Sequence, residues 1–382
     1  MKRKILIVIL SLVALIILLQ LGGMLLVKLG IQPFYIQSDD QGHIRLVRPD
    51  STPTPQPPLQ PGVGSVQAAD AQPVIIDTDM AADDWMAILY LLQRSDVAVK
   101  AITVSGTGEA HCDPGVRNAM NLVMLAGRPE IPVACGRETP LQGNHTFPKD
   151  WRQAVDSMFG LALQENPNPP SEMDAAELLI HTAQESDSKI HLLTLGPLTN
   201  VAETLESDPT FADKLQSITI MGGAVHVPGN VGSSSNIQNE AAEWNIYVDP
   251  HAAAIVFNSG VPITLVPLDA TNDVPVTMDF YQRKMKERLT PSAEFDYRVL
   301  MKLDSSIRAG QYDFWDPLTA AVLTDESLVT IQEYMLSVIE EEGPESGRTL
   351  ASDKGHLIRV AIKAELPPFE KLFLDTLNGQ MP

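Results

Sequence analysis

Residues Val74 to Leu92 read VIIDTDMAADDWMAILYLL, and this stretch decides the fold class. A short apolar run ends in four carboxylates, Asp77, Asp79, Asp83 and Asp84, and a helical pattern follows. A buried strand that delivers polar side chains at its carboxyl end is typical of an open α/β sheet. Carboxylates at this density repel one another unless a cation binds, and oxygen ligands suit a hard ion such as Ca²⁺ or Mg²⁺. Negative charge is favourable in the first turn of a helix, and this alternative would account for Asp83 and Asp84. It does not account for Asp77 and Asp79, which lie at the end of the strand. We therefore expect a metal site.

Apolar runs alternate with helical patterns along the rest of the chain. Strands are expected at 74–76, 99–104, 191–195, 217–221 and 262–266, and helices at 85–93, 116–126, 175–185, 201–205 and 250–258. This alternation predicts an α/β fold, an open and mostly parallel sheet with crossover helices. We expect the folded domain to occupy residues 73–382.

The first 72 residues have a different character. Lys2, Arg3 and Lys4 precede an uncharged apolar stretch, residues 5–27, which is long enough to cross a bilayer as a helix. A cleaved signal peptide is the alternative, but its apolar core is normally shorter and a cleavage site follows closely. We expect residues 1–30 to be a basic cytoplasmic end and a transmembrane anchor. Proline-rich residues 31–72 then form a linker to an extracytoplasmic domain.

Composition and net charge limit the classes of molecule that the protein is expected to bind. The formal net charge is -21, so phosphate would be repelled and nucleic-acid binding is not expected. Apolar residues make up 44% of the chain, enough for a sizeable core. The two cysteines, Cys112 and Cys135, are compatible with an exported disulfide or with two buried thiols.

Four further segments follow in order. They read LGPLTN at 195–200, MGGA at 221–224, NEAAEWNIYVDP at 239–250 and DFWDPL at 313–318. Together with the opening Asp-x-Asp-x-x-x-Asp-Asp pattern, this series resembles the nucleoside hydrolases of the inosine–uridine-preferring family, from about residue 73 to the end. The resemblance implies an enzyme that splits the N-glycosidic bond of ribonucleosides, giving ribose and free base, with Ca²⁺ at the bottom of its site.

The resemblance also implies a ligand set. Asp79, Asp84 and Asp316 would bind Ca²⁺ through carboxylates, and Leu195 would bind it through its backbone carbonyl. The transition state is oxocarbenium-like, as in other glycoside hydrolysis. A metal-bound water has a lowered pKa, and Asp79 is the expected base that takes its proton.

Ribose contacts follow from the same resemblance. Asp83 is expected in the catalytic group and on a ribose hydroxyl, with Glu243 and Asn245 on the others. The upstream asparagine of the family is matched here by Asn230, and two alternatives stay open, Asn236 and Asn239. Asp77 is expected to support the site from behind.

The base-binding side departs from the family pattern. Where many members have Gly-Asn after the second strand, this chain has Thr107, which can still donate and accept a hydrogen bond. Trp315 stands where one subgroup has a histidine, which is similar to the purine-preferring subgroup and its aromatic stacking. The second stacking ring is expected near Phe147 or Trp151. His145 lies where members place a histidine in the substrate loop, as a leaving-group acid or a surface residue.

Two rival functions compete with this interpretation. A haloacid-dehalogenase-type phosphatase also opens with a strand and Asp-x-Asp, but it leaves Asp83, Asp84 and the Glu243 segment unexplained. A non-enzymatic surface protein that binds nucleosides or sugars would suit an anchor and a linker. We expect a nucleoside hydrolase with a lean toward purines. Family members form dimers and tetramers, so a homo-oligomer is open, although the sequence shows no interface.

Overall fold

The computed structural model describes residues 35–38, 44–47 and 57–380. In the first unit, Met1–Pro57, strands β1 (Tyr35–Ser38) and β2 (Ile44–Val47) pair antiparallel. The expected anchor at residues 5–27 lies outside the described residues, as does part of the expected linker. Among the described residues, we find no helix with the length and apolar character needed to cross a bilayer.

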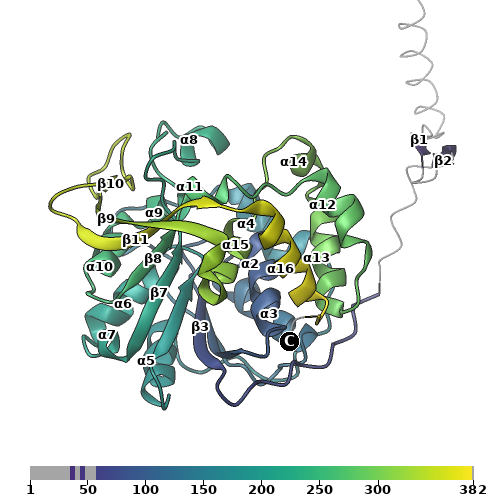
Figure 1. Ribbon diagram of the computed structural model, residues 1–382, viewed down its shortest axis with the longest axis horizontal. Coiled ribbons are helices and arrows are strands. Elements are labelled where there is room, and N and C mark those ends of the chain that lie inside the picture. Colours follow the sequence, from purple (N-terminus) through teal and green to yellow (C-terminus); the bar gives the residue numbers. More distant parts are fainter. Residues whose placement is uncertain (1–34, 39–43, 48–56, 381–382) are drawn as a thin grey trace, which may run out of the picture. The chain divides into compact units, whose positions relative to one another are not determined.

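The second unit, Pro58–Pro382, is built on one large sheet (Figure 1). Within residues 57–380 this sheet has nine strands in the order β10-β9-β11-β8-β7-β6-β3-β4-β5. Seven of these strands run parallel, whereas β9 is antiparallel to both β10 and β11. The bounds are β3 (Gln72–Thr78), β4 (Val97–Val104), β5 (Val133–Cys135), β6 (Ile190–Thr194), β7 (Leu215–Met221), β8 (Ile263–Val266), β9 (Val329–Val338), β10 (Thr349–Ala351) and β11 (His356–Ala364).

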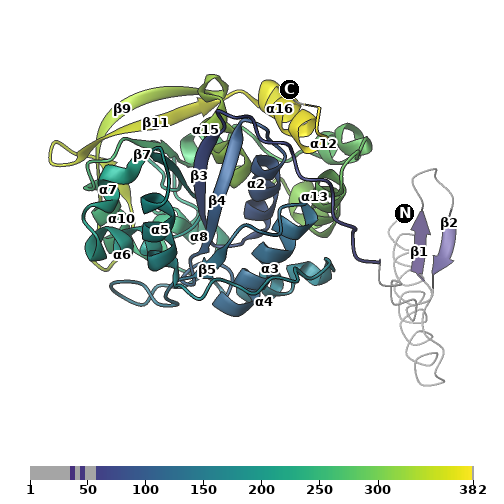
Figure 2. The same ribbon diagram turned by 90° about the horizontal axis from the view of Figure 1, so that it is seen from below.

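Helices cover both faces of the sheet. Helices α2, α3, α13 and α16 lie on one face, and α5, α6, α7 and α10 lie on the other (Figures 1 and 2). Strand β3 serves both cores, because Val74 and Ile76 pack into one and Ile75 packs into the other. The helix bounds are α2 (Ala82–Leu92), α3 (Cys112–Leu125), α4 (Lys149–Asp156), α5 (Ala175–Gln184), α6 (Thr199–Ser207), α7 (Phe211–Lys214), α8 (Val231–Ser234), α9 (Trp244–Val248), α10 (Pro250–Phe257), α11 (Leu268–Thr271), α12 (Met278–Arg283), α13 (Pro291–Lys302), α14 (Asp304–Arg308), α15 (Trp315–Thr324) and α16 (Leu366–Leu377).

The strand order has a switch point beside β3. The chain runs from β3 to β4 and β5 in one direction, and then returns to β6 on the opposite side of β3. Loops leave the carboxyl ends of β3 and β6 on opposite faces at such a switch point, which is where open α/β sheets bind ligands. The carboxylates after β3 therefore lie at a position prepared for a ligand.

The expected α/β fold with its mostly parallel sheet is confirmed. All five expected strands and all five expected helices are present, with ends that differ by a few residues. The antiparallel edge formed by β9 and β10 was not expected. The segment after Glu243 was not among the expected helices, yet residues Trp244–Val248 form helix α9.

Candidate active site

The turn between β3 and α2 is held in an uncommon conformation. Met80 has φ 61°, in the left-handed region that residues with a Cβ seldom adopt. The indole of Trp85 donates a 2.8 Å hydrogen bond to the Met80 carbonyl, and the Met80 amide donates to the Thr78 hydroxyl at 3.0 Å. The Thr78 hydroxyl in turn donates to Asp84. These bonds fix the turn that places the aspartates.

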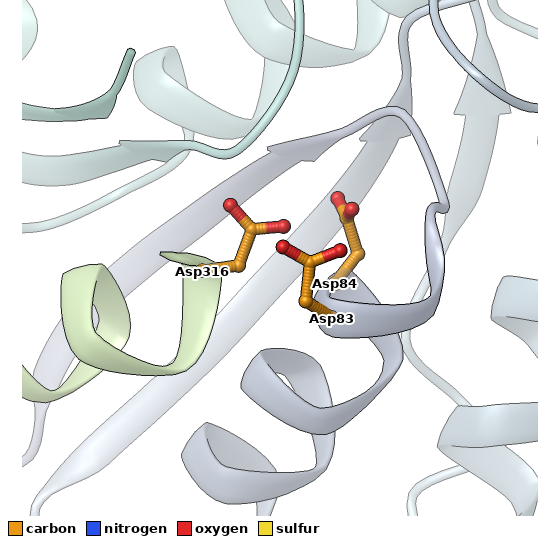
Figure 3. A group of neighbouring side chains, drawn as sticks. All are labelled: Asp83, Asp84 and Asp316. Atoms are coloured by element: carbon orange, nitrogen blue, oxygen red, sulfur yellow. The ribbon is translucent and has the colours of Figure 1, made fainter. Parts of the chain in front are cut away.

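Three carboxylates converge at the end of this turn. Ligand oxygens of Asp83, Asp84 and Asp316 lie within 4.8 Å of one another, two from the start of α2 and one from the start of α15 (Figure 3). Asp84 and Asp316 are buried, and Oδ2 of Asp84 and Oδ1 of Asp316 have no hydrogen-bond partner among the described residues. Burial raises the pKa of Asp83 to about 7 and the pKa of Asp84 and Asp316 well above the usual range. Buried, unpartnered carboxylate oxygens of this kind fit a hard divalent cation.

Asp79 lies next to this group, between two loops. Its backbone amide donates to Oδ1 of Asp84 at 3.2 Å, and its own Oδ2 accepts the backbone amide of Glu109 at 3.1 Å. Burial raises the pKa of Asp79 to about 6, although the hydrogen bonds that it accepts and the charge of Arg152 lower it. Of the expected metal ligands, Asp84 and Asp316 belong to the carboxylate group together with Asp83, whereas Asp79 is not a member and adjoins the group through its backbone amide.

Asp77 lies behind the turn and is completely buried. Its Oδ1 accepts hydrogen bonds from the Thr103 hydroxyl at 2.6 Å and from the Asn200 side chain at 2.7 Å. Burial raises the pKa of Asp77 to about 7. Asp77 therefore ties β3 to β4 and to α6, which is the supporting position expected from the sequence.

The ends of β6 and β7 bring the next expected residues together. The Asn245 side-chain amide donates to the Leu195 carbonyl at 3.0 Å. The Glu243 carboxylate caps helix α9 and accepts the backbone amides of Gly223 at 2.8 Å and Asn245 at 2.9 Å. Burial raises the pKa of Glu243 to about 7. Leu195, Glu243 and Asn245 are therefore connected directly at the same edge of the sheet.

Asn230 is half-buried beside this segment, where its Oδ1 accepts the backbone amide of Trp244 at 3.2 Å. Of the two alternatives, Asn239 uses its side chain to bond the backbone of Ala242 and Ser346. Asn236 is exposed. The structure thus places Asn230 next to Glu243, and Asn239 in a structural role.

Two expected substrate residues have partners within the protein. The Thr107 hydroxyl is buried and lies 2.9 Å from the Ser105 hydroxyl and 3.0 Å from the Thr199 hydroxyl. His145 bonds the Tyr247 carbonyl at 2.7 Å and the Glu342 carboxylate at 3.0 Å, and its ring stacks on Tyr247. The structure therefore provides an internal role for each side chain, and their substrate contacts stay predictions.

Aromatic rings form two groups near the site. Trp315 is half-buried and packs edge-on against Tyr312, with ring centroids 5.1 Å apart. Phe147 and Trp151 both pack against Trp244, with centroids 5.0 Å and 5.5 Å away. Trp315 and both candidates for the second stacking ring, Phe147 and Trp151, therefore each pack against another aromatic ring of the protein.

Sequence reasoning did not identify Arg152, Glu109 and Tyr312. Arg152, on α4, donates to the carbonyls of Gly106 at 2.9 Å and Ala110 at 3.2 Å, and so holds the loop that carries Glu109. No expected helix covered α4. Glu109 lies two residues after Thr107, and Tyr312 immediately precedes the 313–318 segment, so both were next to segments that the sequence did single out.

A disulfide joins Cys112 to Cys135, with a Cα–Cα distance of 5.6 Å. Cys112 begins α3, directly after the loop that holds Asp79, and Cys135 ends β5. The bond therefore attaches one end of this loop to the neighbouring strand, and it answers the question that the two cysteines left open.

The chain is similar in sequence and in fold to several known proteins. Residues 74–371 match the family described as inosine-uridine preferring nucleoside hydrolase. The chain is 37% identical to uridine nucleosidase 1 of Arabidopsis thaliana over 54% of this chain and 59% of that protein. It is also 37% identical to a pyrimidine-specific ribonucleoside hydrolase of Escherichia coli, over 56% of this chain and 65% of that one. The matches thus span less than two thirds of these relatives. The solved structure of a purine-preferring ribonucleoside hydrolase from Gardnerella vaginalis superposes with TM-score 0.69 and 26% identity, covering 81% of this chain and 99% of the other.

Proposed function

Because the chain belongs to the inosine-uridine preferring nucleoside hydrolase family, we propose that it hydrolyses the N-glycosidic bond of ribonucleosides, with Ca²⁺ as its metal. The observation that carries this proposal is the convergence of Asp83, Asp84 and Asp316 within 4.8 Å, next to Asp79. Among the described residues, Oδ2 of Asp84 and Oδ1 of Asp316 have no partner, and carboxylate oxygens of this kind are ligands that suit Ca²⁺.

In this proposal, Asp79, Asp84 and Asp316 hold the ion together with the Leu195 carbonyl, and Asp83 lies within reach of the same position. The Leu195 carbonyl already accepts one hydrogen bond, from Asn245, and its second lone pair is available for a cation. When bound, Ca²⁺ lowers the pKa of a coordinated water and orients the ribose hydroxyls.

The protein residues then have separate tasks. Asp79 takes a proton from the water that attacks C1′ of ribose, as the bond from C1′ to the base breaks. Asp83, Glu243, Asn245 and Asn230 bind the ribose hydroxyls. The backbone amides of Gly223 and Asn245 fix the Glu243 carboxylate, so its oxygens are in place before substrate arrives.

We further propose that the enzyme prefers nucleosides with a purine base. Trp315 is half-buried at the start of α15, next to Asp316, and a flat indole suits a purine. The names of similar proteins include both pyrimidine-specific and purine-preferring hydrolases, so we base the purine lean on Trp315. Thr107 and His145 belong to the same side of the proposed site.

We also propose that residues 1–30 anchor the protein in a membrane, with the catalytic domain outside the cytoplasm. The support is the basic cluster Lys2 to Lys4 followed by the uncharged residues 5–27. A homo-oligomer remains part of the proposal through the family resemblance.

The test is base release by the full chain, purified in mild detergent with Ca²⁺. Inosine, guanosine, uridine and cytidine are incubated separately and free base is resolved by chromatography, with Asp79→Asn as the control. We expect release by the wild type, fastest from the purine nucleosides, and almost none by the variant. Tight nucleoside binding without base release would instead indicate the non-enzymatic binding protein.

A further inference from the structure

Tyr312 presents a buried polar atom with no partner. Its side chain is 8% exposed, and its hydroxyl has no hydrogen-bond partner within the described residues. A buried donor that is left unpaired is costly, and it requires an explanation. The ring itself is well packed, because it lies edge-on against Trp315 at 5.1 Å.

The position of Tyr312 is fixed on both sides. Its carbonyl accepts the Val276 amide at 2.9 Å, and the Phe314 amide donates to the Val274 carbonyl at 3.0 Å. Phe314 is anchored in an aromatic core, with its ring centroid 4.9 Å from that of Phe280. The unpaired hydroxyl is therefore not a consequence of a loose loop.

The surroundings of the hydroxyl are those of the proposed active site. Burial raises the pKa of Tyr312 well above its usual value, and the nearby carboxylates of Asp83 and Glu109 raise it further. The phenol therefore keeps its proton and acts as a neutral hydrogen-bond donor. It is a neutral donor in a region that otherwise presents carboxylates.

We propose that the Tyr312 hydroxyl donates a hydrogen bond to the nucleobase of a bound nucleoside, at a carbonyl oxygen or an unprotonated ring nitrogen. The proposal rests on the proposed function and adds a leaving-group contact to it. When the bond from C1′ to the base breaks, its electron pair goes to the base nitrogen while the water oxygen bonds to C1′. A fixed donor stabilises the negative charge that develops on the base, whereas a carboxylate would oppose it.

Trp315 and Tyr312 would then act on the same base in different ways. Trp315 would contact the face of the base, and Tyr312, whose ring packs edge-on against Trp315, would donate to its edge. Ribose contacts are already supplied by Asp83, Glu243 and Asn245. On the side of the base, Thr107 and His145 already bond other protein groups, and Tyr312 adds a donor that has no such bond among the described residues.

The test compares two leaving groups in the full chain with Ca²⁺. Tyr312→Phe removes the hydroxyl and keeps the ring against Trp315. With nucleosides, kcat should fall about ten- to a hundredfold, the size expected for loss of one buried hydrogen bond in the transition state. With 4-nitrophenyl β-D-ribofuranoside, whose leaving group is already a stable anion, kcat should change less than about twofold. The melting temperature should not fall, because the hydroxyl has no hydrogen-bond partner in the part of the chain that the structure describes.

The matched control is Tyr334→Phe, which removes a hydroxyl that donates to Gln332 on strand β9 and should leave both activities unchanged. Equal loss on both substrates, or no loss on either, would overturn the proposal. A wild type that releases neither base nor nitrophenol would contradict the proposed function itself, so the two failures are distinguishable.

Discussion

Gly108 lies directly against Asp79: a Cβ atom on Gly108 would stand 2.0 Å from the Cβ of Asp79. Gly196 approaches from the other side, where a Cβ would stand 2.6 Å from the same atom. The loops after β4 and β6 thus enclose the side chain that we propose as the base. No side chain larger than hydrogen fits at either position without moving Asp79.

Gly108→Ala should therefore disable the site while leaving most of the fold intact. Overpacking of this kind costs about 1–3 kcal/mol of stability, and a displacement of a reacting group by about 1 Å costs roughly a hundredfold in rate. Base release from inosine and thermal melting measure the two effects separately. Gly62→Ala is the control, since its new Cβ would meet its nearest atoms at 3.4 Å. Wild-type activity in Gly108→Ala would contradict the close fit.

Calcium should stabilise the protein, and more so as the pH rises. Burial raises the pKa of Asp83 to about 7 from 3.8, so without metal the folded state holds protons that the unfolded chain has lost. The free energy of unfolding of the metal-free protein should then fall from roughly pH 4 to pH 7. Bound Ca²⁺ keeps the carboxylates ionised and removes this loss. At a hundredfold excess over Kd, binding adds about 2.7 kcal/mol.

Melting curves with Ca²⁺ or with a chelator, recorded across this pH range, measure the difference. The gap between the two curves should widen toward pH 7 and then level off. Asp316→Asn should remove most of the gap. Curves that coincide at every pH would show that the carboxylate group does not bind the ion.

The disulfide should contribute to stability and to activity. Cys112 and Cys135 are 23 residues apart, and closing a loop of this length is worth about 3 kcal/mol in the chain-entropy model. The double variant Cys112→Ser, Cys135→Ser should melt several degrees lower, and its kcat should fall because the loop that bonds Asp79 loses one attachment. Dithiothreitol should destabilise the wild type and leave the double variant unchanged. Equal sensitivity of the two proteins to the reductant would indicate an effect unrelated to this bond.

The sequence predicted the core of this architecture because its pattern is local. An apolar run, a cluster of aspartates and a helical pattern occupy residues 74–92, so strand, turn and helix could be assigned without tertiary information. Asp316 required the family resemblance, since nothing in its own segment indicates that α15 starts next to α2. The β9 strand was missed because apolar and polar residues do not alternate regularly along it, and its burial does not alternate regularly either.

The parts of the site that escaped prediction depend on contacts between distant segments. Arg152 lies in a short, mostly polar helix, and only the fold shows that its guanidinium bonds the Gly106 carbonyl. Nothing in the sequence indicated that the Thr107 hydroxyl lies within bonding distance of Ser105 and Thr199, and its expected contact with substrate stays a prediction. Such outcomes follow from packing, which a local pattern does not contain.

Arg152 should affect Asp79 in two ways, and two substitutions separate them. The guanidinium holds the loop through the carbonyls of Gly106 and Ala110, and its charge lowers the pKa of Asp79. In Arg152→Met both effects are lost, so the pKa of Asp79 should rise and the acid limb of the profile of kcat/KM against pH should move to higher pH.

In Arg152→Lys the charge stays but the planar fork of donors is lost. Its acid limb should stay near that of the wild type, while kcat falls about tenfold at every pH through the loosened loop. Profiles measured with inosine and saturating Ca²⁺ compare the three proteins. An acid limb that is the same in wild type and Arg152→Met would mean that the charge of Arg152 does not reach Asp79 once the metal is bound.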